Sequence, residues 1–162
     1  MPRRSSLAVA LLTVAIGALG AQPPGPPGGG PPSPGLPLKA TRTHTFTTTK
    51  GTWISLDVSP DGQTIVFDLL GDLYTLPITG GTAKRITSGL AFDAQPRFSP
   101  DGARIVFISD RSGGENVWHM KADGSDTTQL TTGNANMYVS PVFSPDGKTI
   151  VVSRSGGTFG TA

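Results

Sequence analysis

The chain has 162 residues, no cysteine and a formal net charge of +2, and this length is enough for one domain of ordinary size. Arg3 and Arg4 account for the charge: without them 11 basic side chains balance 11 acidic ones, so no basic surface indicates a nucleic-acid partner. The lack of cysteine excludes disulfides and a lipid anchor at a signal cleavage site. Ten of the 11 acidic residues are Asp, which favours turns, whereas Glu favours helices, so the composition indicates a turn-rich β protein.

Residues 1–21 are predicted to be a secretory signal peptide with a helical apolar segment. Arg3 and Arg4 form a basic start, residues 7–16 form an apolar run too short to span a bilayer, and residues 18–21 supply small residues for cleavage. The paired arginines also give a weak twin-arginine pattern, so the export route, Sec or Tat, stays open. We expect a periplasmic or secreted protein with no membrane span once the signal is removed.

Residues 22–40 are predicted to be a disordered linker. The run from Gln22 to Pro37 consists almost entirely of Pro and Gly. Pro removes backbone donors, and neither residue type supplies much apolar area for a core, so the segment should be an extended, partly polyproline II tether. A Pro-rich ligand for a partner is the alternative interpretation.

Residues 41–162 contain an internal repeat. The tetrapeptide Ser-Pro-Asp-Gly occurs three times, at spacings of 40 and 45 residues, and an apolar triplet follows each copy. Because Pro presets φ and Ser or Asp can bond the turn amides, we predict that these residues have a structural role in turns. The twelve turn residues are Ser59, Pro60, Asp61, Gly62, Ser99, Pro100, Asp101, Gly102, Ser144, Pro145, Asp146 and Gly147.

The second half of each unit repeats as well. Residues 73–89 match residues 117–133 at a constant offset of 44, which gives repeats of about 52–89, 90–133 and 137–162. The second repeat carries four additional residues at 111–114, and residues 154–157 repeat this insertion. Asp-Gly and Gly-Gly pairs are typical of hairpin turns. In the second repeat we expect four strands near residues 95–98, 104–109, 116–121 and 128–130.

The apolar triplets indicate how the sheets pack. Ile105, Val106 and Phe107 place apolar side chains on both faces of their strand, so the sheet must be covered on both sides. In a β-propeller each four-stranded blade is covered by its two neighbours, and units of this length have the expected size. We therefore predict an all-β fold, an incomplete β-propeller of two to three four-stranded antiparallel blades after the signal helix and the disordered linker.

The repeats resemble the WD40-like, or PD40, repeats of TolB-type propellers. The family pattern joins the Ser-Pro-Asp-Gly turn and an Ile-x-Phe strand to a Ser-Asp-Arg turn, an Asp-Gly turn and a Leu-Thr close. These stand here at residues 99–102, 105–107, 109–111, 122–125 and 130–131. The resemblance covers roughly residues 50 to 157. It implies a propeller of about six or seven blades, so the chain is expected to be a fragment of such a protein or an incomplete gene product.

A closer resemblance concerns residues 51–71 and 93–99, which look like part of the propeller of exported bacterial amidohydrolase-superfamily proteins. It implies that the chain is the non-catalytic propeller of a hydrolase, with a gating or scaffolding role. The divalent metal would then belong to a hydrolase domain outside this chain. The alternative is a TolB-like periplasmic propeller without an enzymatic domain, which binds a protein or peptide. The expected partner is accordingly the remainder of its own chain, or a periplasmic protein or peptide.

We predict no catalytic, cofactor-binding or metal-binding set in this chain. His44, in an expected lead-in strand, and His119 are isolated, and the His-x-His pair of the amidohydrolase metal site is absent. No Gly-x-Ser-x-Gly elbow is present, and residues 156–160 lack the Lys of a phosphate loop. Asp110 and Arg111 are expected to form a local pair in their hairpin. The aromatic residues expected to pack in the blades are Trp53, Tyr74, Phe92 and Trp118.

We predict that the chain associates with itself or is poorly soluble when it is expressed alone. Terminal repeats expose the faces that a neighbouring repeat would cover, and soluble monomers rarely expose a contiguous apolar patch beyond roughly 300–600 Å². Size-exclusion chromatography measures this directly. A sharp monomer peak, together with cooperative unfolding, would show that the prediction is wrong.

Overall fold

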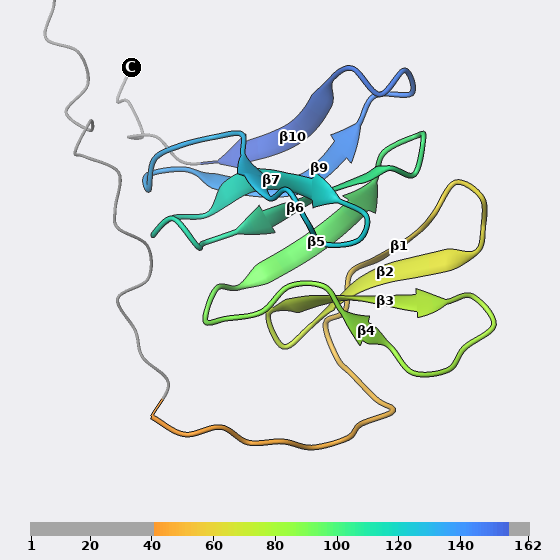
Figure 1. The fold of residues 1–162 in the computed structure, drawn as a ribbon. Coiled ribbons are helices and arrows are strands. Elements are labelled where there is room, and N and C mark those ends of the chain that lie inside the picture. The colour runs from red at the N-terminus through yellow and green to blue at the C-terminus, as the bar shows by residue number, and fades with distance from the viewer. Residues whose placement is uncertain (1–40, 156–162) are drawn as a thin grey trace, which may run out of the picture.

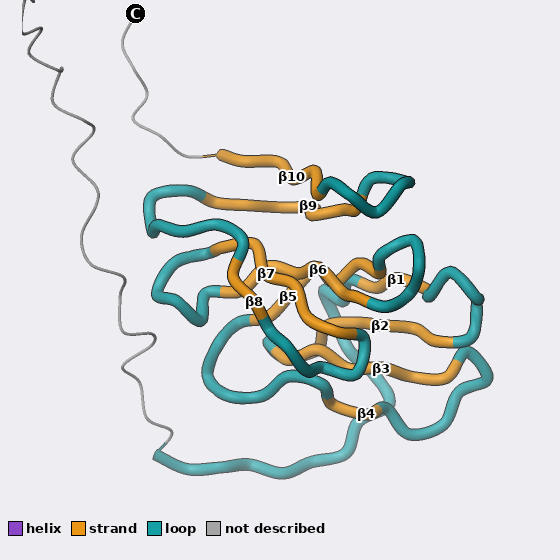
Figure 2. The backbone as a smooth tube through the Cα atoms, turned by 45° about the horizontal axis from the view of Figure 1, so that its top comes forward, coloured by secondary structure: helices purple, strands orange, loops and turns teal. Residues whose placement is uncertain are grey.

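The computed structural model describes residues 41–155. The predicted signal helix and linker lie outside the described residues, and so do residues 156–162. Strands are the only regular element between residues 41 and 155, so this part of the chain holds no helix long and apolar enough to cross a membrane. The all-β prediction is confirmed for this region (Figure 2).

The strands form three antiparallel sheets that follow one another in chain order (Figure 1). The first two sheets are four-stranded, and neighbours in sequence are neighbours in the sheet, as in the blade of a propeller. The third sheet is a two-stranded hairpin. The first blade contains β1 (Leu56–Val58), β2 (Thr64–Leu69), β3 (Asp72–Pro77) and β4 (Lys84–Arg85). The second contains β5 (Asp93–Phe98), β6 (Arg104–Ser109), β7 (Asn116–Lys121) and β8 (Thr128–Gln129), and the third contains β9 (Met137–Phe143) and β10 (Ile150–Ser155).

The four strands predicted for the second repeat are present with small differences at their ends. The two central strands, β6 and β7, have the predicted bounds. Strand β5 starts two residues earlier than predicted, because Asp93 and Ala94 pair with Ser109 and Ile108 before the register shifts. Strand β8 ends at Gln129, although Leu130 still donates its N–H to the Val117 carbonyl at 2.8 Å.

The second blade is covered on both faces, as its apolar triplet predicts. Ile105 and Phe107 pack against the first blade in a cluster with Val66 and Leu73, and all four are fully buried. Val106 and Ile108 point to the opposite face and pack with Tyr138 of the third blade. Alternation of side chains along β6 therefore supplies one core on each side. The outer faces of the first and third blades stay partly open, at Leu56, Val58, Val142 and Val151.

A backbone irregularity links each blade to the one before it. Gln95 in β5 and Ser140 in β9 have φ of 55° and 56°, and each stands directly before a Pro. The bulge frees the N–H of that residue from its own sheet. The Gln95 N–H donates to Asp68 Oδ2 at 2.9 Å, and the Ser140 N–H donates to Gln95 Oε1 at 2.6 Å. Two successive junctions thus share one kind of polar contact.

The structure corrects the predictions made for two aromatic residues and for His44. Trp53 is 99% exposed and Phe92 is 60% exposed, so neither packs inside a blade. Both lie in connecting segments, Trp53 before β1 and Phe92 between β4 and β5, where no sheet covers the ring. His44 is exposed and lies in no strand, because the first strand begins only at Leu56. In contrast, Tyr74 stacks on Phe67 at 5.6 Å between ring centroids, and Trp118 packs against the core.

Arg111 pairs with Asp93 rather than with Asp110. Its Nη2 lies 2.7 Å from both carboxylate oxygens of Asp93, whose side chain is only 1% exposed. The guanidinium also lies 5.2 Å from the ring centroids of Phe107 and Trp118. Sequence adjacency suggested the wrong partner, because Asp93, at the start of β5, faces the hairpin across Ser109. This buried pair closes the end of the second blade.

We predict that Asp93→Ala lowers the free energy of unfolding by about 2 to 3 kcal/mol, because it leaves the Arg111 guanidinium, which is three-quarters buried, without its carboxylate. Urea denaturation measures the change. Asp126→Ala is the matched control, since it removes an exposed carboxylate from its pair with Lys121 and should cost much less. Equal losses in the two variants would contradict a stabilising role for the buried pair.

Candidate functional site

The three Ser-Pro-Asp-Gly turns have one hydrogen-bond pattern. In each turn the Ser hydroxyl donates to the Asp carboxylate at 2.5 Å, and the Gly N–H donates to the Ser carbonyl at 2.8 Å. The same carboxylate accepts the N–H of the residue after Gly, at 3.0 to 3.1 Å. The hydrogen bond from Ser, followed by the bond from the backbone N–H, lowers the pKa of Asp61, Asp101 and Asp146 below the usual value. These hydrogen bonds stabilise the turn, and they engage the Ser and Asp side chains within the turn itself.

The three turns lie at the same end of their blades and touch in succession. A Cβ placed on Gly102 would lie 3.5 Å from Pro60 Cδ, and one placed on Gly147 would lie 3.7 Å from Pro100 Cδ. Each Gly also has a φ near 70°, which an L side chain rarely adopts. The Pro of one turn therefore packs beside the Gly of the next. The carboxylates stand on separate blades and do not converge on a common point.

The two histidines do not form a metal site within the described residues. Burial, followed by the positive charge of Arg104, lowers the pKa of His119 and favours its neutral form. Arg104 Nη1 lies 2.9 Å from His119 Nδ1, so the guanidinium donates to the ring. His44 lies apart from it in the exposed segment before β1. Between residues 41 and 155, no group of three or more His, Cys, Asp or Glu residues is placed to hold a metal ion.

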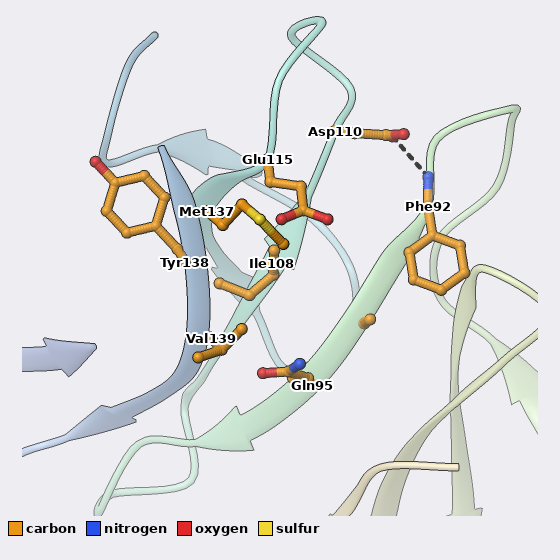
Figure 3. A pocket seen from close by; sticks show the side chains of 9 residues that line it. Phe92, Gln95, Ile108, Asp110, Glu115, Met137, Tyr138 and Val139 are labelled. Atoms are coloured by element: carbon orange, nitrogen blue, oxygen red, sulfur yellow. Dashed lines mark hydrogen bonds between the residues drawn. The ribbon is translucent and has the colours of Figure 1, made fainter. Parts of the chain in front are cut away.

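A pocket of about 200 Å³ opens between the second and third blades. Figure 3 shows the side chains of Glu115, Met137 and Ile108 converging on this space, with Asp110 beside it and the ring of Phe92 pointing away from it. Two of its lining residues, Asp110 and Glu115, lie in the segment between β6 and β7. The Ser-Pro-Asp-Gly turn of this blade joins β5 to β6 and so lies at the other end of β6, as the ribbon in Figure 1 shows. Its lining residues are Phe92, Ala94, Gln95, Ile108, Asp110, Glu115, Met137, Tyr138 and Val139.

Among the residues that the structure describes, two carboxylates and no basic side chain line this pocket. Asp110 Oδ1 accepts the Phe92 N–H at 2.8 Å, which fixes the carboxylate at the rim. The neighbouring cations are already bound elsewhere: Arg111 donates to Asp93, and Arg154 donates to Asn136 Oδ1 at 2.8 Å. The pocket therefore combines negative charge with an apolar wall that is open to solvent.

The four-residue insertion of the second repeat lies beside this pocket. Asp110 and Glu115 flank the inserted residues 111–114, and the corresponding positions of the first repeat are Leu70 and Gly71. The insertion is visible in the sequence, but the pocket could not be predicted from it. The opposite wall of the pocket comes from β9, which begins about twenty residues later in the chain. Glu115 is the only Glu of the chain, and its position directly after the insertion is the one signal that could have singled it out.

The family model of the TolB beta propeller domain, PD40, matches residues 36–162. Among curated proteins, the chain is 35% identical over 77 residues to an uncharacterized protein of Agrobacterium fabrum, which covers 45% of this chain and 26% of that protein. It is 41% identical over 58 residues to the Tol-Pal system protein TolB of Bordetella pertussis, which covers 35% of this chain and 13% of that protein.

Two solved structures share the fold. A TolB-type protein from Agrobacterium tumefaciens superposes with a TM-score of 0.60 and 30% identity, over 67% of this chain and 40% of that one. TolB from Acinetobacter baumannii superposes with a TM-score of 0.53 and 28% identity, over 65% of this chain and 27% of that one. The chain thus spans less than half the length of each of these relatives. Its three repeats, its stacked four-stranded blades and the match to the family model place it in the PD40 family of TolB-type β-propeller domains.

Proposed function

We propose that the chain is part of an exported TolB-like propeller that binds another protein. The observation that carries this proposal is the family match over the blades, together with relatives that include a Tol-Pal system protein TolB. Stacked blades hold their end loops in a fixed arrangement, which suits the docking of a partner on one face. The pocket between the second and third blades adds an exposed apolar and acidic surface at such a face.

Periplasmic location is part of this proposal. It rests on the predicted signal at residues 1–21, which lies outside the described residues, and on the likeness to TolB. The closer resemblance of residues 51–71 and 93–99 to propellers of exported amidohydrolases stays a prediction. The relatives reported above support a TolB-like propeller better than an attached hydrolase.

The name of the Bordetella relative makes Pal of the source organism the first partner to test. Isothermal titration calorimetry of the full chain with purified Pal should give saturable binding. A chain carrying Gly102→Val, which places a β-branched side chain at a φ of 71°, should bind less because the second blade is distorted. Absence of binding to Pal and to other periplasmic proteins, combined with a hydrolase domain encoded in frame beyond Ala162, would favour the amidohydrolase alternative instead.

A further inference from the structure

We propose that the pocket between the second and third blades receives the side chain of an arginine from the protein partner. This inference deepens the proposed function, and it rests on that function for the source of the arginine. Its basis is the juxtaposition of Asp110 and Glu115, across the β6–β7 hairpin, with the apolar residues Ile108 and Met137.

The size of the pocket favours one long side chain over a cofactor. Small-molecule sites usually occupy about 300–1,000 Å³, whereas this pocket has a volume of about 200 Å³. It is open on one side, where Met137 is 56% exposed. A side chain that enters from a docked surface would cover the apolar part of Met137, and covering it favours binding.

The charge of the pocket selects a cation. Asp110 uses one carboxylate oxygen for the Phe92 N–H, and no hydrogen bond or ion pair within the described residues engages the Glu115 side chain. Gln95 cannot supply the missing positive charge, and its Oε1 already accepts the Ser140 N–H. An incoming guanidinium would therefore meet two carboxylates without displacing an existing ion pair.

Arginine suits this combination better than lysine. Its planar guanidinium carries five donors, which can reach two carboxylates, and it is more weakly hydrated than an ammonium group. The chain itself contains an arrangement of this type close by, where Arg111 binds the carboxylate of Asp93 and lies over Phe107 and Trp118. The pocket offers carboxylates beside the apolar side chains of Ile108 and Met137 to an arginine from outside, whereas the ring of Phe92 lies against Gly71 of the first blade.

The insertion makes the pocket specific to one junction. At the junction of the first and second blades, the equivalents of Asp110 and Glu115 are Leu70 and Gly71, and a Cβ on Gly71 would lie 3.3 Å from Phe92 Cδ2. There the ring of Phe92 lies against the turn, and neither of the two equivalent positions carries a carboxylate. A partner that inserts an arginine would thus be held at the second junction and not at the first.

Saturation-transfer difference NMR tests the proposal, because it observes the ligand and tolerates self-association of the full chain. The probe is N-acetyl-arginine methylamide, and N-acetyl-citrulline methylamide is its uncharged near-isostere. We expect saturable binding of the arginine probe with a dissociation constant on the order of a millimolar. The citrulline probe should bind about tenfold more weakly, since it loses its interaction with both carboxylates.

Glu115→Gln and Asp123→Asn are matched variants, because each removes one exposed carboxylate charge, inside and outside the pocket respectively. Glu115→Gln should weaken arginine binding about three- to fivefold, and Asp123→Asn should leave it unchanged. Asp110→Asn should act like Glu115→Gln while it keeps an oxygen acceptor for the Phe92 N–H. Equal binding of the two probes, or equal effects of the two matched variants, would overturn the proposal.

The two proposals fail in different ways. If Pal binds to the chain and Glu115→Gln leaves both Pal binding and the arginine-probe signal unchanged, the pocket proposal is wrong and the proposed function stands. If the arginine probe binds in the pocket and no periplasmic protein binds to the chain, the pocket proposal survives as a property of the site and the proposed function fails.

Discussion

The structure depends on one constraint: a sheet that is apolar on both faces must be covered on both faces. Ile105 and Phe107 point to one side of β6, Val106 and Ile108 to the other, and all are buried. Neither face could be left in water without losing about 25 cal/mol for each Å² of apolar surface. A blade of this composition is stable only between two other blades. Repetition of the unit is therefore the physical condition for its folding, and not only a feature of its sequence.

Apolar packing between the blades would not by itself determine their relative orientation. Hydrogen bonds between neighbouring blades determine it. The bulges at Gln95 and Ser140 direct one backbone N–H towards the preceding blade, where a side-chain oxygen accepts it. Phe98 adds a second such contact, since its N–H donates to Asp57 Oδ2 of the first blade at 2.8 Å. Backbone N–H groups of β5 and β9 and side-chain oxygens of the preceding blade thus determine the relative position of the blades, and with it the geometry of the pocket at the second junction.

Local pattern predicted the fold well, because turns and strands depend on residues close in sequence. The Ser-Pro-Asp-Gly turns and the two faces of β6 are of this kind. Contacts between distant segments were predicted poorly. Arg111 binds Asp93 instead of its neighbour Asp110, and Phe92 lies at the rim of a pocket whose other wall is β9. Residue type alone did not indicate that Trp53 and Phe92 lie outside the blades, because aromatic residues occur both in connecting segments and in cores.

Native-state hydrogen exchange tests the central claim, that cover on both faces by neighbouring blades stabilises each blade. Backbone amides in the most buried strands exchange with solvent only when a large part of the protein unfolds. The account predicts that the backbone amides of β6 and β7 exchange most slowly, among them those of Val106, Phe107, Val117 and Met120. The backbone amides of β10 should exchange faster than those of β6 and β7. Protection of β10 equal to that of β6, or rapid exchange throughout the second blade, would contradict it.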